Sequence, residues 1–267
     1  MPTSTINGIA LYHEVRGSGE PLLLIHGLGS SALDWEEQLD FFSRSYRVIA
    51  FDLRGHGRSD KPQGPYSIRQ FSDDAAALLR QLDVSSAHVV GLSLGGAIAF
   101  QLALDHPGLA RTLTIVNSGP ELILRTLSER FAIGLRFVIV PLFGLPTMGR
   151  MISKRLFPDP ASDGVRRKFE ERFAGNQTRP YLDSLRALVG WSVTARLGEI
   201  RCPVLVVTAD QDYTPVSLKE AYVAQLPDAR LCVVPDSRHA LPMERPAAFN
   251  QMLAGFLGEH VSAGQDS

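Results

Sequence analysis

The sequence predicts an α/β fold: a mostly parallel central sheet of about eight strands, flanked by helices and carrying a helical cap insertion. Three observations predict it. Apolar runs of strand length alternate with segments of helical periodicity in both halves of the chain. Most of these runs are apolar throughout, which is typical of parallel strands covered on both faces. Between the two halves, a long stretch of helical pattern interrupts the alternation.

The interruption divides the chain into a core and a cap. Residues 120–194 have a helical pattern with prolines at several points and no convincing strand. We therefore predict one core domain built from residues 1–119 and 195–267, and a cap built from residues 120–194. The chain has 267 residues, of which 45% are hydrophobic, and this is ample for a sizeable core.

The predicted strands begin with a hairpin. Residues 5–6 and 9–15 alternate between apolar and polar, and the Asn7-Gly8 pair between them favours a tight turn at the edge of the sheet. Continuous apolar runs predict strands buried on both faces at residues 22–25, 47–51, 113–116, 204–208 and 230–234, and a further strand that begins at Ala87 and runs to the turn at Gly91.

Helices are expected between these strands. Ser67 is placed to cap the second of them, and the polar tail at residues 261–267 is expected to fray. The helical spacing of apolar side chains predicts helices at residues 34–44, 67–82, 97–105, 216–226 and 245–257.

An apolar run at residues 131–141 resembles part of a membrane helix. A bilayer crossing takes roughly 20 apolar residues, and Arg136 and Pro141 interrupt this run. We therefore predict no membrane span, and we expect the run to line an apolar cavity or to pack on the core domain.

Charge and cysteine content exclude several classes of protein. The 27 basic and 28 acidic residues nearly balance and form no long run of one sign, so no nucleic-acid partner is expected. Cys202 and Cys232 lie in or beside predicted strands, which indicates buried thiols rather than a disulfide framework and suits a reducing cytoplasm. The first residues show no pattern of an export signal, so we expect a cytoplasmic protein. A homo-oligomer is left open.

The stretch Gly91-Leu92-Ser93-Leu94-Gly95 joins a predicted strand directly to a predicted helix. A turn this tight leaves no room for β-carbons beside the serine, which accounts for both glycines and lifts the serine hydroxyl into a cleft. Small residues also crowd ordinary turns, so the motif alone allows an elbow without chemistry. A serine nucleophile further requires an imidazole base and an orienting carboxylate.

His239 is the candidate base, because its loop follows the last predicted strand and can reach across to the elbow. His26 and His56 also follow strands at their carboxyl ends, where open α/β sheets keep their ligand crevice. They precede Ser93 in the chain and sit in tight glycine turns, so they are second choices. A satisfied surface histidine is the alternative role for His239.

Asp212 is the candidate acid, with Asp210 in reserve. Both follow the predicted strand at residues 204–208, and Pro215 would hold the loop near Asp212. The predicted strand at residues 113–116 is followed by Asn117, so this strand end offers an amide side chain and not a carboxylate. The later loop must then supply the carboxylate.

These residues together resemble the α/β-hydrolase superfamily. The elbow serine, the His26-Gly27 pair, the glycine-rich turn at residues 52–59, Asp212 and His239 occur in the order nucleophile, acid, histidine. The resemblance covers nearly the whole chain, and it implies an α/β-hydrolase fold with a helical cap between the sixth and seventh strands.

The resemblance also implies an oxyanion hole and a reaction. The hole would be built from the backbone N–H groups of Leu28 and Leu94. Dehalogenases and epoxide hydrolases of this fold use an aspartate at the elbow, so Ser93 argues against both. The expected reaction is hydrolysis of carboxylic esters or lactones through an acyl-enzyme, and the apolar cap suggests small, largely apolar substrates.

No cofactor is expected for this reaction, and the histidines do not fall at metal-ligand spacing. Three alternatives stay open. The first is carbon–carbon bond hydrolysis of a ring-cleavage diketone, with Arg136, Arg150 or Arg155 holding a substrate carboxylate. The others are a cofactor-free, haloperoxidase-like perhydrolase and a ligand-sensing protein that is not an enzyme.

Overall fold

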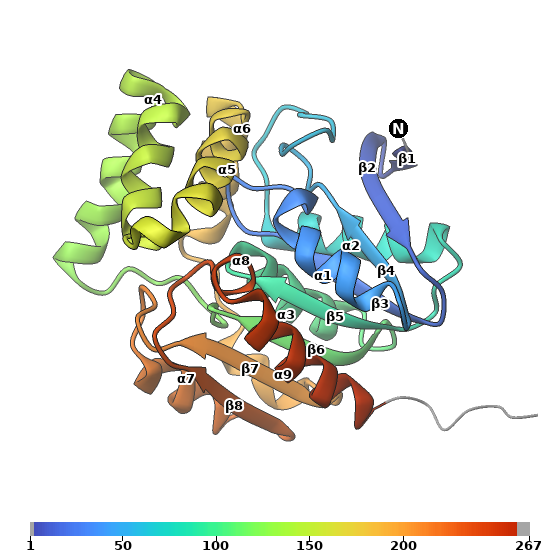
Figure 1. Cartoon of the computed structure of the whole chain (residues 1–267). Coiled ribbons are helices and arrows are strands. Elements are labelled where there is room, and N and C mark those ends of the chain that lie inside the picture. Colours follow the sequence, from blue (N-terminus) through green and yellow to red (C-terminus); the bar gives the residue numbers. More distant parts are fainter. Residues whose placement is uncertain (1–2, 261–267) are drawn as a thin grey trace, which may run out of the picture.

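The computed structural model describes residues 3–260 and contains one eight-stranded sheet in the order β1-β2-β4-β3-β5-β6-β7-β8 (Figure 1). Strands β3 to β8 pair in parallel, and β1 and β2 form an antiparallel hairpin at one edge. The predicted sheet is thereby confirmed. The strands are β1 (Thr3–Ile6), β2 (Ile9–Arg16), β3 (Glu20–Ile25), β4 (Tyr46–Phe51), β5 (Ala87–Leu92), β6 (Ala110–Val116), β7 (Val204–Ala209) and β8 (Ala229–Val234).

Helices cover both faces of the sheet. Short 3-10 helices at Ala32–Trp35, Pro160–Ser162 and Thr194–Glu199 supplement them. The α-helices are α1 (Glu36–Phe42), α2 (Ile68–Gln81), α3 (Leu94–Asp105), α4 (Leu127–Leu156), α5 (Asp163–Ala174), α6 (Thr178–Leu188), α7 (Val216–Val223), α8 (Leu241–Glu244) and α9 (Pro246–Gly258).

Alternate side chains of β3 show why its sequence is apolar throughout. Leu23 and Ile25 join the buried cluster that α2, α3 and α7 form on one face of the sheet. Leu22 and Leu24 join the cluster that α1 and α9 form on the other face. Both sets are fully buried, as expected for a parallel strand between two helical layers.

The predicted Asn7-Gly8 turn and the predicted N-cap residue of α2, Ser67, are both observed. Asn7 and Gly8 have φ values of 48° and 80°, the left-handed conformation that a two-residue hairpin turn requires, and Ile6 pairs with Ile9. The Ser67 hydroxyl accepts the backbone N–H of Gln70 and so caps α2. Both predictions are confirmed.

The ends of several elements differ from the prediction. The helix expected at residues 34–44 starts as a 3-10 turn and ends at Phe42, while α7 ends at Val223 rather than at residue 226. Pro246 begins α9, and the short α8 precedes it. The tail at residues 261–267 lies outside the described residues.

The helical insertion lies between β6 and β7 and consists of α4, α5 and α6, which gather beside one another in Figure 1. Its two ends meet, because Glu121 and Ser192 form an isolated antiparallel bridge and Val193 donates to the backbone oxygen of Pro120 at 2.8 Å. The chain thus leaves the core and returns to it at neighbouring points, as the predicted division at residues 120–194 requires.

The expectation for residues 131–141 holds on one side of the helix only. Phe137, Ile139 and Val140 pack in a cluster that includes Tyr213 and Ala240 of the core domain, whereas Phe131, Leu135 and Val138 are exposed. These residues lie in α4, which by length and apolar composition alone could cross a membrane, and only 17% of its most apolar window is buried. A single apolar helix is weak evidence of a span. Moreover, Gly144 has φ 76° and ψ 168°, so the helix is broken there into two shorter ones. The outward side chains of α4 are exposed and do not pack on the core.

Candidate active site

The Ser93 elbow has a backbone conformation that side-chain-bearing residues rarely adopt. Ser93 has φ 54° and ψ −115°, and α3 begins at the next residue. A β-carbon at Gly91 would lie 2.2 Å from the carbonyl oxygen of Gly95, and one at Gly95 would lie 2.1 Å from the carbonyl oxygen of Ile25. The elbow therefore requires both glycines in order to fit beside β3.

The predicted oxyanion-hole residues, Leu28 and Leu94, belong to two segments that meet at the elbow. Leu94 is the first residue of α3, where a backbone N–H has no partner within the helix. A β-carbon at Gly27 would lie 3.5 Å from that of Ser93, so the chain just before Leu28 passes close to the side chain of the candidate nucleophile. This placement suits the predicted role of both N–H groups.

His239 lies in the loop between β8 and α8, and its ring meets Asp212 from the loop after β7. The Nδ1 atom of His239 is 2.6 Å from Oδ1 of Asp212. Tyr213 stacks on the imidazole with 4.3 Å between ring centroids. The side chain of His239 is 18% exposed and that of Asp212 is 1% exposed, so the imidazole keeps an open side while its carboxylate partner is closed to water.

Ser93 and His239 stand at the same edge of the sheet, because the carboxyl ends of the neighbouring strands β5 to β8 lie there in order. Within residues 3–260, no hydrogen bond joins Ser93 Oγ to the His239 ring. Catalytic hydrogen bonds in unliganded enzymes are often long and tighten when substrate binds. The topology thus meets the requirement of the predicted triad, and the direct contact between nucleophile and base stays a prediction.

Lys219 on α7 is a buried cation that contacts the carboxylate of Asp212. Its Nζ atom lies 2.7 Å from Asp212 Oδ2, and it also donates to the backbone oxygen and the hydroxyl of Thr214. Burial alone would raise the pKa of Asp212, but the interactions with His239 and then with Lys219 outweigh burial and hold that pKa well below its usual range. Asp212 is therefore ionised at neutral pH, with a partner on each oxygen.

Replacing Lys219 by methionine is expected to lower the free energy of unfolding by about 3–5 kcal/mol near pH 7, because a buried carboxylate then lacks its cation. The lowered pKa of Asp212 contributes stability that is present above the carboxyl group's unfolded pKa and lost as pH falls toward the folded value. The deficit of the variant should accordingly shrink below about pH 4. Urea unfolding of the variant and of the unmodified protein, near pH 7 and below about pH 4, measures this stability deficit. Lys154→Met, at an exposed lysine, is the control, and a deficit independent of pH would contradict the assignment.

Asp210, the reserve candidate for the acid, is directed elsewhere. Its carboxylate accepts the backbone N–H of Asp236 at 3.1 Å and that of Ser237 at 3.2 Å. These bonds brace the start of the loop that carries His239. The geometry therefore gives the two aspartates different tasks, and Asp212 is the one in contact with the imidazole.

Asn117 holds the same loop from the end of β6. Its Nδ2 atom donates to the backbone oxygen of His239 at 2.9 Å and to that of Arg238 at 3.1 Å, while its Oδ1 accepts the N–H of Ala209 at 2.8 Å. The sequence reasoning noticed Asn117 only as a position without an acid. Its buried amide in fact ties the end of β7 to the backbone of the candidate base.

His26 and His56, the second-choice candidates for the base, form hydrogen bonds with the backbone of nearby loops. His26 Nε2 accepts the N–H of Leu53 at 3.0 Å, and its Nδ1 contacts the carbonyl oxygen of Gly27 at 2.8 Å. Burial lowers the pKa of His56 to about 3, so this ring is neutral. Asp52 accepts backbone N–H groups of Ala32 and of the turn that follows it. The glycine-rich turn at residues 52–59 is thus structural, and neither ring rivals His239 as the base.

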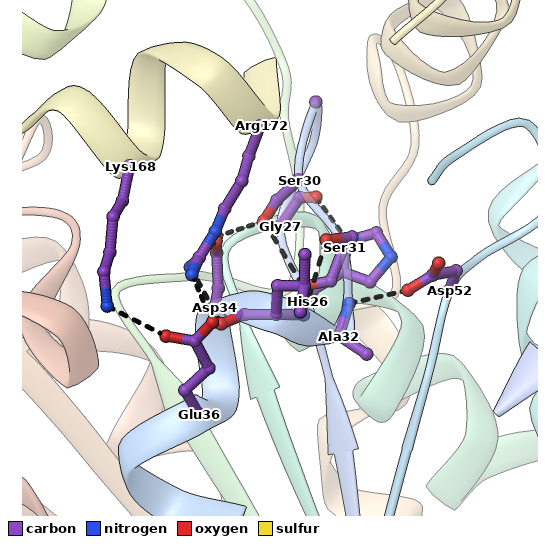
Figure 2. A network of polar contacts seen from close by, with 12 residues as sticks. His26, Gly27, Ser30, Ser31, Ala32, Asp34, Glu36, Asp52, Lys168 and Arg172 are labelled. Carbon is purple, nitrogen blue, oxygen red and sulfur yellow. Dashed lines mark hydrogen bonds and ion pairs between the residues drawn. The ribbon is translucent and has the colours of Figure 1, made fainter. Parts of the chain in front are cut away.

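Helix α5 of the cap is fastened to the loop that follows β3. Figure 2 shows Arg172 reaching from α5 to the carboxylates of Asp34 and Glu36, at 3.2 Å and 2.7 Å. Asn176 donates to the backbone oxygen of Gly29 at 2.8 Å. Because Gly29 follows Leu28 directly, the cap contacts the segment expected to supply one oxyanion donor.

The positive charges of two cap arginines, Arg136 and Arg155, act on Tyr213, the ring that stacks on His239. Arg136 Nη1 is 3.3 Å from the hydroxyl of Tyr181, and the guanidinium of Arg155 is 5.0 Å from the centre of the Tyr213 ring. Within the described part of the chain, neither arginine forms an ion pair. The cap therefore places positive charge, without a paired carboxylate, close to the ring that stacks on His239.

The described residues offer no metal site, and both cysteines are free. The described residues contain no group of three or more His, Cys, Asp or Glu that could hold a metal ion. Cys202 and Cys232 are free and half-buried rather than fully buried, and burial raises the pKa of Cys202 to about 11. The groups gathered at this edge of the sheet are a hydroxyl, an imidazole and a carboxylate, a set that can perform nucleophilic acyl transfer.

Comparison with known proteins establishes the family. The model of the alpha/beta hydrolase fold family matches residues 20–246. The chain belongs to the α/β-hydrolase family. A relative in Azorhizobium caulinodans, named putative carbamate hydrolase RutD, is 33% identical over 97% of this chain and 99% of its own. The predicted family and fold are confirmed.

Two further α/β-hydrolases resemble the chain over nearly its whole length. The 3-oxoadipate enol-lactonase 2 of Acinetobacter baylyi is 29% identical and covers 93% of each chain. The solved structure of Est816, described as an N-acyl homoserine lactone degrading enzyme, is 30% identical with a TM-score of 0.79 and covers 96% of this chain and 100% of its own. Family and relatives together show that the protein is a hydrolase.

Proposed function

We propose that this α/β-hydrolase cleaves carboxylic esters or lactones through an acyl-enzyme at Ser93. The Ser93 oxygen attacks the carbonyl carbon while its proton passes to Nε2 of His239, and that proton then goes to the leaving alkoxide oxygen as the C–O bond breaks. Water repeats these steps on the acyl-enzyme, which releases the acid and restores Ser93. Asp212 orients the imidazole, and the Leu28 and Leu94 N–H groups stabilise the oxyanion.

One observation carries this proposal: the hydrogen-bonded His239–Asp212 pair stands at the same sheet edge as the strained Ser93 elbow. With Nδ1 bound to the carboxylate, Nε2 is the ring atom left to accept a proton. The buried carboxylate also stabilises the imidazolium that forms when the proton is taken. These are the requirements of a general base for a serine nucleophile.

The relatives support the reaction class and widen the substrates to be tested. Their names mention a carbamate hydrolase, an enol-lactonase and a lactone degrading enzyme. Each name describes a carbonyl bonded to a heteroatom, which a serine nucleophile can attack. We therefore propose esters and lactones of small, largely apolar acids as substrates, with carbamates as the comparison class.

A substrate panel with covalent labelling tests the proposal. Purified protein is assayed on p-nitrophenyl esters of increasing acyl length, on γ- and δ-lactones, and on p-nitrophenyl carbamates. Turnover of esters or lactones is expected, and a fluorophosphonate should abolish it while adding one phosphonyl group to the peptide that contains Ser93. Labelling of another residue, or carbamate turnover without ester or lactone turnover, would overturn it.

The two cap arginines favour a second candidate, carbon–carbon bond hydrolysis of a ring-cleavage diketone. Such a substrate carries a carboxylate, and Arg136 and Arg155 supply positive charge at Tyr213, which stacks on His239, without an acidic partner among residues 3–260. The same triad would act on the ketone carbonyl. Turnover of such a diketone, with no turnover of the ester and lactone panel, would favour this candidate over the first.

A further inference from the structure

Helix α4 exposes an unusually large apolar surface. Leu127 is 82% exposed, Phe131 73%, Leu142 69% and Phe143 64%, and these are the four highest values among the exposed large hydrophobic side chains. Seven of the thirteen such side chains in the described chain lie on this one helix: Leu127, Phe131, Leu135, Val138, Leu142, Phe143 and Met151. A concentration of this kind marks a surface that contacts a membrane or another protein. We call these seven side chains the α4 face.

The α4 face is separate from the side of the helix that builds the cap. Val140, Leu145 and Met148 point inward and join the buried cluster that includes Phe169 and Phe173 of α5. Side chains on α4 that the cap's own packing requires are therefore already buried. The outward apolar side chains add nothing to that cluster, and nothing in residues 3–260 covers them.

The charge around the α4 face has one predominant sign. Within α4 the basic residues number five and the acidic residues one, Glu129. The wider cap, residues 120–194, holds twelve of the 27 basic and seven of the 28 acidic residues. Two of the twelve, Lys168 and Arg172, form ion pairs with Asp34 and Glu36 of the core, so ten basic residues remain against seven acidic ones, a net charge of +3. Arg130, Arg150 and Lys154, on the same helix, are exposed to solvent. Apolar side chains flanked by exposed basic ones suit a surface that is both apolar and anionic.

We propose that the α4 face docks the cap onto the surface of a bilayer containing anionic lipids. Phe131, Leu142 and their neighbours would enter the boundary between headgroups and acyl chains, and the basic residues of the cap would meet the headgroup charge. Docking onto a second copy through the same face would bring two caps of net positive charge together, which like-charge repulsion opposes. The break at Gly144 leaves each half of α4 shorter than the roughly 20 residues that a crossing takes, so the contact lies along the surface.

On docking, α4 would lie between the bilayer surface and the candidate active site. Phe137, Ile139 and Val140 of α4 pack in the cluster that includes Tyr213 and Ala240, and the Arg136 side chain reaches inward to the hydroxyl of Tyr181. The helix that meets lipid on one side therefore faces the His239 region through its other side. Membrane docking itself does not depend on which bond the protein hydrolyses, so the two proposals can fail separately.

Vesicle co-sedimentation tests the docking. The full chain is mixed with extruded vesicles of phosphatidylcholine alone or with phosphatidylglycerol added, at low and at high salt. Binding to the anionic vesicles is expected, with a partition coefficient at least about ten-fold above that for phosphatidylcholine and a marked fall at high salt. Phe131→Ser/Leu142→Ser should lower it by about ten-fold or more, and Arg150→Glu/Lys154→Glu should remove the preference for anionic lipid.

Leu218→Ser is the matched control, since Leu218 is 55% exposed but lies on α7, outside the cap. It should bind vesicles as the unmodified protein does. Thermal unfolding of the Phe131→Ser/Leu142→Ser variant in buffer without vesicles should match that of the unmodified protein, which checks that the variant is folded independently of any activity. Three outcomes would overturn docking: no vesicle binding, a dimer in light scattering that the same double substitution dissociates, or resistance to alkaline carbonate extraction, which would indicate a spanning helix.

Discussion

Replacement of Ser93 by alanine is expected to lower kcat for ester or lactone hydrolysis by about 10⁵- to 10⁶-fold, because the atom that accepts the acyl group is removed. The elbow should persist. The Ser93 side chain caps no helix bond, and alanine meets the same backbone strain at φ 54° as serine does. Steady-state rates on the best substrate of the panel measure the loss, and thermal unfolding checks that the fold is kept.

Ser118 provides the control for this variant. Its hydroxyl donates to the backbone oxygen of Ser93 at 2.7 Å, so it lies beside the elbow without taking part in acyl transfer. Ser118→Ala should lower kcat by no more than about ten-fold, the value of one hydrogen bond. Turnover by Ser93→Ala within ten-fold of the unmodified protein would show that Ser93 is not the nucleophile.

The elbow and the sheet could be predicted because their requirements are local. Gly91 and Gly95 are needed wherever a strand turns this sharply into a helix, and a β-carbon at either would meet backbone oxygen. A run of consecutive apolar residues likewise predicts that alternate side chains of β3 are buried on the two faces of the sheet, as observed. Such signals do not depend on how distant segments pack.

Lys219 could not be found in this way. It lies on a short helix, where a lysine is ordinarily solvated, and only the approach of α7 to the loop after β7 buries it against Asp212. Asn117 posed the same difficulty, because its partners at Ala209 and His239 are remote in sequence. Contacts of this kind, which hold a catalytic side chain in position, are made by tertiary packing, and the spacing of residues in the sequence does not predict them.

The surroundings of residues 131–141 were mispredicted in part, for a related reason. An apolar run states that its side chains avoid water, but it does not state what covers them. At residues 131–141 we expected the core or a cavity, and the structure leaves the outward side chains exposed. The hydrophobic pattern therefore predicted the helix correctly, but it did not predict that one side of the helix is exposed.

Asp212→Asn is expected to lower kcat by about 10⁴-fold, while Asp210→Asn, which changes the reserve candidate, should lower it by less than about ten-fold. An amide at Asp212 can donate to Nδ1 of His239 and so favours the wrong tautomer, with the proton on Nε2, where a base must be free. Asp210 instead braces backbone N–H groups, so its loss should appear in stability before it appears in rate. Reversed effects would make Asp210 the acid.

A double variant separates catalysis from folding at this position. Asp212→Asn leaves Lys219 as a buried cation without its anion, which should cost about 3–5 kcal/mol of unfolding free energy and would by itself reduce activity if the protein unfolds. Asp212→Asn/Lys219→Met removes both charges and should regain most of that stability. Its kcat should nevertheless stay about 10⁴-fold low, because the imidazole still lacks a carboxylate. Recovery of kcat together with stability would instead show that Asp212 acts only through the fold, and the triad would lose its acid.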